Sequence, residues 1–307
     1  MRRAGRVSRG YAEIGDDVAV VPLGKGRLLV KVDMLVEHTD VPPGMTYRQA
    51  ARKSVAMCVS DFAAKGARPD SFLVSLGLRK GVTQEQVDGL ASGFRDAAQE
   101  WRVRLVGGDT NESEELVIGC TMVGFAKRVV PRDGASPGDV LVVSGNFGFP
   151  PAGLRLLANS ARTGPGFARA ATASVLMPTP SLRVGTALAP HLTSSMDSSD
   201  GLARSVHTLA RESGVGFELT SLPLGEGVEE FAAANGLDPE ALVLQGGEEY
   251  VIVGTVKRRR LGAARRAARV AGGDLIEIGR ATGSGRVELR TGGKTRPVAD
   301  EGWTHLR

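Results

Sequence analysis

Residues 46–66, TYRQAARKSVAMCVSDFAAKG, decide how the first half of this chain folds. Thr46 is followed three positions later by Gln49, which is the pattern of a helix capping box. Gly66 is a typical residue just beyond a helix C-terminus, because it adopts left-handed backbone angles without strain. The stretch therefore predicts one long helix over about 46–65.

An acid lies inside this helix. Asp61 has mostly small and apolar neighbours, and burying a carboxylate there costs free energy unless a cation or hydrogen-bond donors accompany it. Lys65 follows four residues later, so an ordinary ion pair on one helix face is an alternative explanation. The sequence leaves both interpretations open.

Strand-like and helix-like runs alternate around this helix, which predicts an α/β (α+β) domain with a mixed sheet. A second helix is expected from about Thr83 to Arg102, again with Gln three positions after Thr. VPLGKGRL, residues 21–28, predicts a hairpin turn, because it lacks the spacing of a phosphate-binding loop. The expected strands are 18–21, 28–33, 71–76, 105–106 and 116–125.

A turn-rich stretch, PRDGASPGD at 131–139, precedes a second α/β pattern. We therefore expect two domains, 1–135 and 136–307. In the second, the expected helices are 152–161, 181–189 and 202–213, and the expected strands are 140–144, 193–196, 216–219, 250–256, 274–279 and 286–289.

Composition narrows the class of protein. The chain has 307 residues, 42% hydrophobic content and a formal net charge of +5. The densest basic run, 257–260, opens a helix pattern without interleaved aromatic residues, so it indicates a solvated helix face and no nucleic-acid partner. Cys58 and Cys120 form no CxxC pair, and such low cysteine content is typical of a reducing cytosol. With no long apolar run and no signal-peptide pattern, a cytoplasmic protein without membrane attachment is expected.

Aspartates gather at predicted turns among Gly and Ser, where carboxylates can converge on Mg²⁺, which prefers oxygen ligands. Asp197 ends a predicted strand, and helix capping does not explain it, whereas Ser199 or Asp200 could be an ordinary N-cap. Asp109 follows two glycines after a strand, and a tight turn is its alternative. The aspartates considered for this role are Asp16, Asp17, Asp33, Asp40, Asp61, Asp109, Asp197 and Asp200.

The four histidines have no zinc-ligand spacing, and no general base stands out. A phosphate monoester is already ionised near neutral pH, so as a nucleophile it requires metal ions rather than a base. The sequence therefore predicts Mg²⁺-dependent phosphate chemistry without a catalytic base.

Eight motifs in order carry a resemblance: IGDD (14–17), VDMLV (32–36), 51–69, LVGGDT (105–110), GASPGD (134–139), SMDSSDGL (195–202), LQGGEEY (244–250) and GWTHL (302–306). Over almost its whole length the chain resembles the thiamine-monophosphate kinase family of the aminoimidazole ribonucleotide synthetase superfamily. The resemblance implies an N-terminal domain that dimerises through its sheet, a C-terminal α/β domain and ATP bound at the shared cleft. The implied reaction is ATP-dependent, in-line phosphorylation of thiamine monophosphate to thiamine diphosphate with several Mg²⁺ ions.

The same resemblance implies roles for individual residues. Substrate contacts fall on Asp40, Glu248 and Trp303. A register shift would put His38 in the place of Asp40, Glu248 could instead face solvent, and Trp303 could instead be a packed tail residue. ATP contacts fall on Gly108, Asp109, Arg132 and Ser199, and metal ligands on Asp16, Asp17, Asp33, Asp61, Asp109, Asp197 and Asp200.

This chain also departs from the family pattern. Lys31 and Val32 stand where Ser and Thr often precede the ligand Asp33, and Glu249 replaces a common Asp. The alternatives are another ATP-using enzyme of the superfamily, a non-catalytic metal or nucleotide-binding regulator, and, weakest, a basic nucleic-acid module. Selenophosphate synthetase and the hydrogenase-maturation dehydratase are disfavoured, because the sequence has no N-terminal reactive cysteine and no cysteine at the C-terminus.

Overall fold

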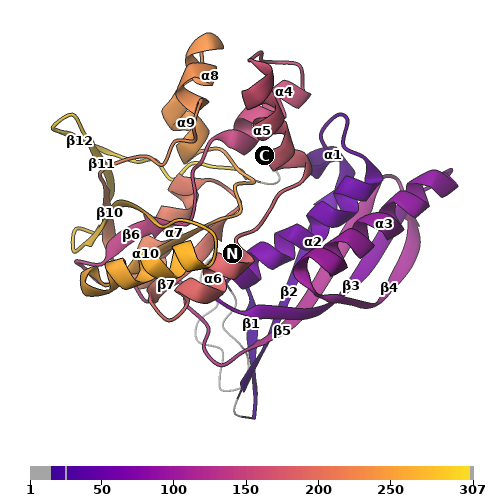
Figure 1. The fold of residues 1–307 in the computed structure, drawn as a ribbon, viewed down its shortest axis with the longest axis horizontal. Helices are drawn as coiled ribbons and strands as arrows, with labels where there is room; N and C mark the ends of the chain where they lie inside the picture. Colours follow the sequence, from indigo (N-terminus) through magenta and orange to yellow (C-terminus); the bar gives the residue numbers. More distant parts are fainter. Residues whose placement is uncertain (1–14, 25, 305–307) are drawn as a thin grey trace.

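The computed structural model describes residues 15–24 and 26–304. The first half is a five-stranded sheet in the order β1-β2-β5-β3-β4. Two helices, α2 and α3, run parallel to each other and cover one face of this sheet (Figure 1). The elements are β1 (Ala19–Leu23), β2 (Gly26–Val36), α1 (Glu37–Asp40), α2 (Tyr47–Ala64), β3 (Arg68–Arg79), α3 (Gln84–Trp101), β4 (Arg104–Ser113) and β5 (Val117–Ala126).

The helix α2 is the central element of the molecule. It begins at the predicted capping box of Thr46 and Gln49, and 14 of its 18 residues are buried. Its N-terminal half packs on α3 and the first sheet, and its end packs against the second half of the chain. There Gly185 allows backbone contact, since a Cβ at that position would lie 2.0 Å from the carbonyl oxygen of Ala63.

The second half is a seven-stranded sheet in the order β12-β11-β8-β10-β6-β9-β7. Successive β6 residues face different cores: Val140 and Val142 pack with α6 and α10, and Leu141 and Val143 pack with α7. The two-domain α/β (α+β) architecture predicted from the sequence is confirmed. The elements are β6 (Val140–Val143), α4 (Phe149–Leu157), α5 (Pro165–Leu176), α6 (Leu182–Leu188), β7 (Leu192–Ser198), α7 (Leu202–Ser213), β8 (Gly216–Leu219), α8 (Val228–Ala234), α9 (Pro239–Leu244), β9 (Val251–Val256), η1 (Arg258–Arg260), α10 (Leu261–Val270), β10 (Ile276–Thr282), β11 (Val287–Thr291) and β12 (Lys294–Pro297).

Some local expectations were wrong. The strand expected at 105–106 continues to Ser113, so Asp109 lies within β4 rather than after it. Parallel pairing with β3 extends the strand through its glycines, and a Cβ on Gly108 would lie 2.3 Å from the carbonyl oxygen of Val74. The N-cap of α7 is Gly201, without a side-chain cap, so neither Ser199 nor Asp200 caps it. The sequence also missed four short elements, namely α1, α8, α9 and β12, together with the helix α5.

The other face of the first sheet is apolar and open. Val32, Met34, Leu73 and Phe125 are exposed there, with exposed fractions of 41–64%. In the part of the chain that the structure describes, none of the helices is both long enough and apolar enough to cross a lipid bilayer.

Candidate active site

Three carboxylates that are far apart in the sequence meet between the two halves of the molecule. Asp17 precedes β1, Asp61 lies on α2, and Asp197 is near the end of β7. One oxygen from each lies within 4.8 Å of the other two, and all three residues are buried. Two of the acids expected to bind metal, Asp16 and Asp33, lie beside this cluster through shared cationic partners.

Three basic side chains partly neutralise these acids. The Lys65 ammonium lies 2.5 Å from Asp16 Oδ1 and 2.7 Å from Asp17 Oδ2. The Arg132 guanidinium also pairs with Asp17 and donates to the carbonyl oxygen of Gly15. Lys31 lies between Asp33 and Asp61.

The alternative pairing of Asp61 with Lys65 is therefore wrong. The Lys65 ammonium extends past the helix end to the turn before β1 and also donates to the Ser195 carbonyl at 2.7 Å. The cation beside Asp61 comes from β2 instead, with Lys31 Nζ 2.9 Å from Asp61 Oδ2.

The three clustered acids have different pKa values because their partners differ. Burial alone would raise the pKa of Asp17, but Lys65 and Arg132 outweigh it and hold that pKa below the ordinary value. Burial and the neighbouring Asp197 raise the pKa of Asp61 well above the ordinary range. Burial and Asp17 raise the pKa of Asp197 to about 7, although the Ser60 hydroxyl donates to it at 3.0 Å.

This donor set fits Mg²⁺. Only carboxylate oxygens form the cluster, and hard divalent ions of this kind take oxygen ligands. A bound cation would lower the pKa values of Asp61 and Asp197, which burial and neighbouring carboxylates raise. Asp17, Asp61 and Asp197 are thus the residues that would hold such an ion.

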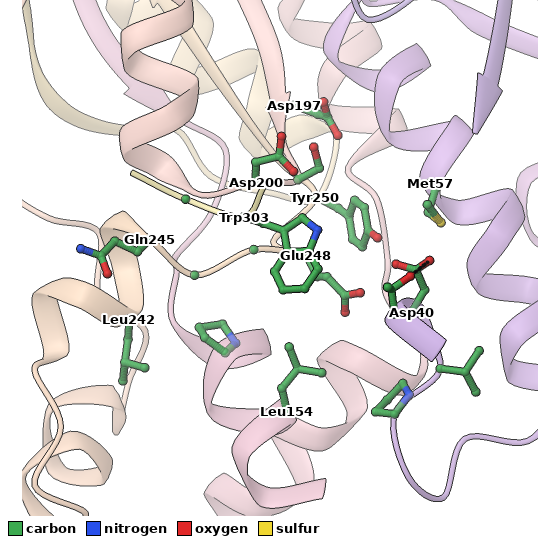
Figure 2. A pocket seen from close by; sticks show the side chains of 18 of the residues that line it. Asp40, Met57, Leu154, Asp197, Asp200, Leu242, Gln245, Glu248, Tyr250 and Trp303 are labelled. Atoms are coloured by element: carbon green, nitrogen blue, oxygen red, sulfur yellow. Dashed lines mark hydrogen bonds between the residues drawn. The ribbon is translucent and has the colours of Figure 1, made fainter. Parts of the chain in front are cut away.

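A cavity of about 1190 Å³ opens beside the cluster. Asp33, Asp61 and Asp197 form part of its wall, and so do Ser199 and Asp200 of the loop after β7. Another part of the wall holds Trp303 and Glu248 of the C-terminal half, together with Asp40 and Met57 of the N-terminal half (Figure 2). The cavity wall therefore combines carboxylates with an exposed indole.

The predicted substrate contacts have defined environments. Trp303 is 50% exposed within the cavity wall, and its backbone N–H donates to the carbonyl oxygen of Asp200 at 3.0 Å. Asp40 and His38 both line the cavity. Asp40 Oδ2 accepts hydrogen bonds from the Val36 backbone N–H and the Thr39 hydroxyl, so one carboxylate oxygen supports the local turn.

Glu248 is held by a buried lysine from the other half. Lys53 on α2 is 1% exposed, and its ammonium lies 2.5 Å from Glu248 Oε1 and 2.9 Å from the carbonyl oxygen of Asp40. Glu248 therefore does not simply face solvent. It has φ of +63°, and its Oε2 is buried without a hydrogen-bond partner among the described residues.

Two predicted residues lie apart from this assembly. Neither Gly108 nor Asp109 is among the described residues that line the cavity. Strand register places Asp109 in one row with Ser75, Gly119 and Met34, which is the row of the open sheet face. Its Oδ1 accepts the Thr110 backbone N–H at 2.9 Å.

Residue-by-residue reasoning missed Lys53 and Lys65. Lys53, Met57, Asp61 and Lys65 recur at a spacing of four, which places them along one side of α2. Asp61 lines the cavity, Lys53 holds the cavity residue Glu248, and Lys65 pairs with Asp16 and Asp17 of the acidic cluster. The signal available in the sequence was three charged residues, Lys53, Asp61 and Lys65, on one side of a helix whose other residues are mostly small or apolar.

We predict strong coupling between Lys53 and Glu248. Lys53→Met or Glu248→Gln should each lower the free energy of unfolding by about 3–5 kcal/mol, since each leaves a buried group unpaired. The double variant should lose less free energy of unfolding than the two single variants together, with a coupling energy on the order of 1–3 kcal/mol. Urea denaturation of the four proteins measures this.

The exposed pair Arg104–Asp70 provides the control for that cycle. Arg104→Met and Asp70→Asn should show no measurable coupling, because water screens this pair. Additive losses at Lys53 and Glu248 would contradict a structural ion pair between them.

A second prediction concerns pH. The pKa of Asp197 is about 7 in the folded protein, above its ordinary 3.8, so the folded chain binds a proton that the unfolded chain lacks between these values. In EDTA, stability should therefore fall as pH rises toward 7 and then level off. Between pH 5.5 and 7.5 the free energy of unfolding of the native protein should fall by about 2 kcal/mol more than that of Asp197→Asn. Denaturant unfolding at the two pH values measures this difference. The exposed-site variant Asp274→Asn should behave like the native protein, and an unchanged slope in Asp197→Asn would refute the prediction.

Comparisons with known proteins agree with this architecture. The AIR synthase related protein family matches through its N-terminal domain at residues 15–126 and its C-terminal domain at residues 136–292. Thiamine-monophosphate kinase of Nitrosopumilus maritimus is 36% identical over 95% of this chain and 93% of its own length. The enzyme of the same name from Pyrococcus abyssi is 32% identical over 95% of this chain and 90% of its own length.

Solved structures give the same result. "AaThiL complexed with AMPPCP and TMP" superposes with a TM-score of 0.86 at 31% identity, covering 95% of this chain and 92% of that one. The hydrogenase maturation protein HypE in complex with ATP has a TM-score of 0.74 at 21% identity, which shows a common fold alone. The resemblance seen in the sequence motifs is confirmed, and the chain belongs to the thiamine-monophosphate kinase family of AIR synthase related proteins.

Proposed function

We propose that this protein phosphorylates thiamine monophosphate to thiamine diphosphate with ATP, by direct in-line transfer of the γ-phosphoryl group to the substrate phosphate. The observation that carries the proposal is one cavity whose wall holds two acids of the cluster, Asp61 and Asp197, together with Trp303 and Glu248. A relative at 31% identity is named as a complex with AMPPCP, an ATP analogue, and TMP. Cytoplasmic location is part of the proposal, since both cysteines are free and buried.

Different residues of the cavity wall would bind different groups of the reactants. The indole face of Trp303 would attract the cationic thiazolium ring, because an aromatic face favours a cation. Glu248, fixed by Lys53, would contact the substrate as part of the cavity wall. These contacts would place the substrate phosphate toward Asp33, Asp61 and Asp197.

Several Mg²⁺ ions would be held by the predicted set Asp16, Asp17, Asp33, Asp61, Asp109, Asp197 and Asp200. When bound, they offset the repulsion between the two anionic phosphate groups. Ser199 and Arg132 would contact ATP, and Arg132 already lies against Asp17. No side chain is assigned as a general base, so the rate would come from positioning and charge neutralisation.

The open face of the first sheet would form a homodimer, with 1–135 as the dimerising domain and 136–307 as the second domain. Exposed Val32, Met34, Leu73 and Phe125 would be removed from water there. Asp109 and Gly108 lie on β4 beside this face, so their predicted contacts with metal and ATP would be made in the partner subunit's site.

A charge on this face should break the dimer. Leu73→Glu would bury an unpaired carboxylate in the interface, so it should sediment as a monomer while keeping its helical circular dichroism. Val270→Glu, at an 86% exposed position of α10, is the matched control and should stay dimeric. Monomeric native protein would refute the proposed dimer.

The reaction is tested by incubating the protein with ATP, Mg²⁺ and thiamine monophosphate and quantifying thiamine diphosphate and ADP. Asp109→Asn should fold normally and lose Mg²⁺-dependent turnover by about 100-fold or more, because a charge-stabilising group is removed. Glu112→Gln, an exposed change on the same strand, should retain activity. An unchanged rate in Asp109→Asn would remove this residue from the site.

The products discriminate among the alternative functions. Stoichiometric thiamine diphosphate supports the proposal. ADP without thiamine diphosphate would indicate another acceptor within the superfamily, and neither product would indicate a non-catalytic binding protein.

A further inference from the structure

One cation of the acidic cluster differs from the other two in its position. Lys31 on β2 places its ammonium 3.1 Å from Asp33 Oδ1 and 2.9 Å from Asp61 Oδ2. It thereby links two elements, β2 and α2, through carboxylates that both line the cavity. Its side chain is 20% exposed, and Lys31 itself is part of the cavity wall.

The other two cations are engaged away from the cavity wall. Lys65 is fully buried and is shared by Asp16, Asp17 and a backbone carbonyl. Arg132 is fixed by Asp17 and by the Gly15 carbonyl. Neither residue is among the described residues that line the cavity, so Lys31 is the cation of this cluster on its wall.

The position of Lys31 conflicts with a metal ion bridging the same two oxygens. Mg²⁺ binds oxygen ligands at about 2.0–2.1 Å, so an ion shared by Asp33 Oδ1 and Asp61 Oδ2 would lie between them. The ammonium already lies between these two atoms, within hydrogen-bond distance of each. Two cations at such a short separation repel each other strongly, and the two arrangements exclude one another.

We propose that the Lys31 ammonium acts as a built-in cation that takes the place of one divalent ion between Asp33 and Asp61. The second oxygens of these carboxylates remain for metal, together with Asp17 and Asp197, whose oxygens cluster with one from Asp61. The inference rests on the proposed Mg²⁺ site but not on the identity of the phosphate acceptor.

This arrangement changes the metal requirement of the site. An ammonium carried by the chain is present at any Mg²⁺ concentration, whereas a bound ion is lost when the metal is scarce. It supplies one positive charge instead of two, and it donates hydrogen bonds to its neighbours rather than coordinating them. Lys31 is thus a positioning residue that also fixes how many divalent ions the site accepts.

The test is a count of Mn²⁺ ions bound per chain in the full-length protein, by calorimetric titration and by paramagnetic resonance of free Mn²⁺. Lys31→Met should bind one ion more per chain than the native protein. Lys31→Arg, which keeps the positive charge, should bind the native number, and so should the exposed-site control Lys80→Met.

The possible outcomes separate this inference from the proposed function. Equal, non-zero counts in native protein and Lys31→Met would overturn the role of Lys31 and leave the metal site intact. No binding in either protein would overturn both proposals. No ion in the native protein with one in Lys31→Met would support the built-in cation and contradict a site with several metals.

A second measurement needs no variant, in case Lys31→Met fails to fold. Anomalous scattering from Mn²⁺-soaked crystals of the native protein locates the ions directly. Peaks near Asp17 and Asp197 with Lys31 still between Asp33 and Asp61 would support the inference. A Mn²⁺ ion coordinated by both Asp33 and Asp61, with Lys31 displaced, would overturn it.

Discussion

The buried ammonium of Lys65 lies where the two halves of the chain meet. It contacts Asp16 and Asp17 from the segment before the first sheet and the backbone carbonyl of Ser195 from the second sheet. A fully buried ammonium is costly unless every partner stays in place, so these contacts constrain both halves at once. The position of Asp17 against Asp61 and Asp197 depends on this constraint, and so does the acidic cluster.

The helix α2 extends this constraint along the whole site. One side of it carries Lys65 and Asp61 at the acidic cluster and, nearer its N-terminus, Lys53, which fixes Glu248 of the second half. Buried ion pairs at both ends therefore tie the same helix to both sheets. A helix held in this way keeps the distance between the acidic cluster and Glu248 constant, which suits a reaction that depends on positioning.

The charges in the cluster do not balance. Asp16, Asp17, Asp33, Asp61 and Asp197 face Lys31, Lys65 and Arg132, and burial together with the neighbouring carboxylates raises the pKa values of Asp61 and Asp197. An excess of carboxylate in a partly dry site stores electrostatic energy that a divalent cation relieves on binding. The excess of carboxylates is therefore consistent with the Mg²⁺-dependent phosphoryl transfer proposed for this chain.

The sequence by itself determined the helices with complete end signals, such as α2 and α3, because capping boxes and periodicity are local properties. It also determined the family, through motifs spread over the chain. Only the tertiary structure decided which cation pairs with which acid. Each of Lys31, Lys53 and Lys65 pairs with a carboxylate that lies outside its own helix or strand. It likewise decided that Asp109 lies within β4 on the open face, because parallel pairing with β3 overrides the turn tendency of two glycines. Ion-pair partners and strand ends depend on distances between segments remote in sequence, and local patterns do not contain those distances.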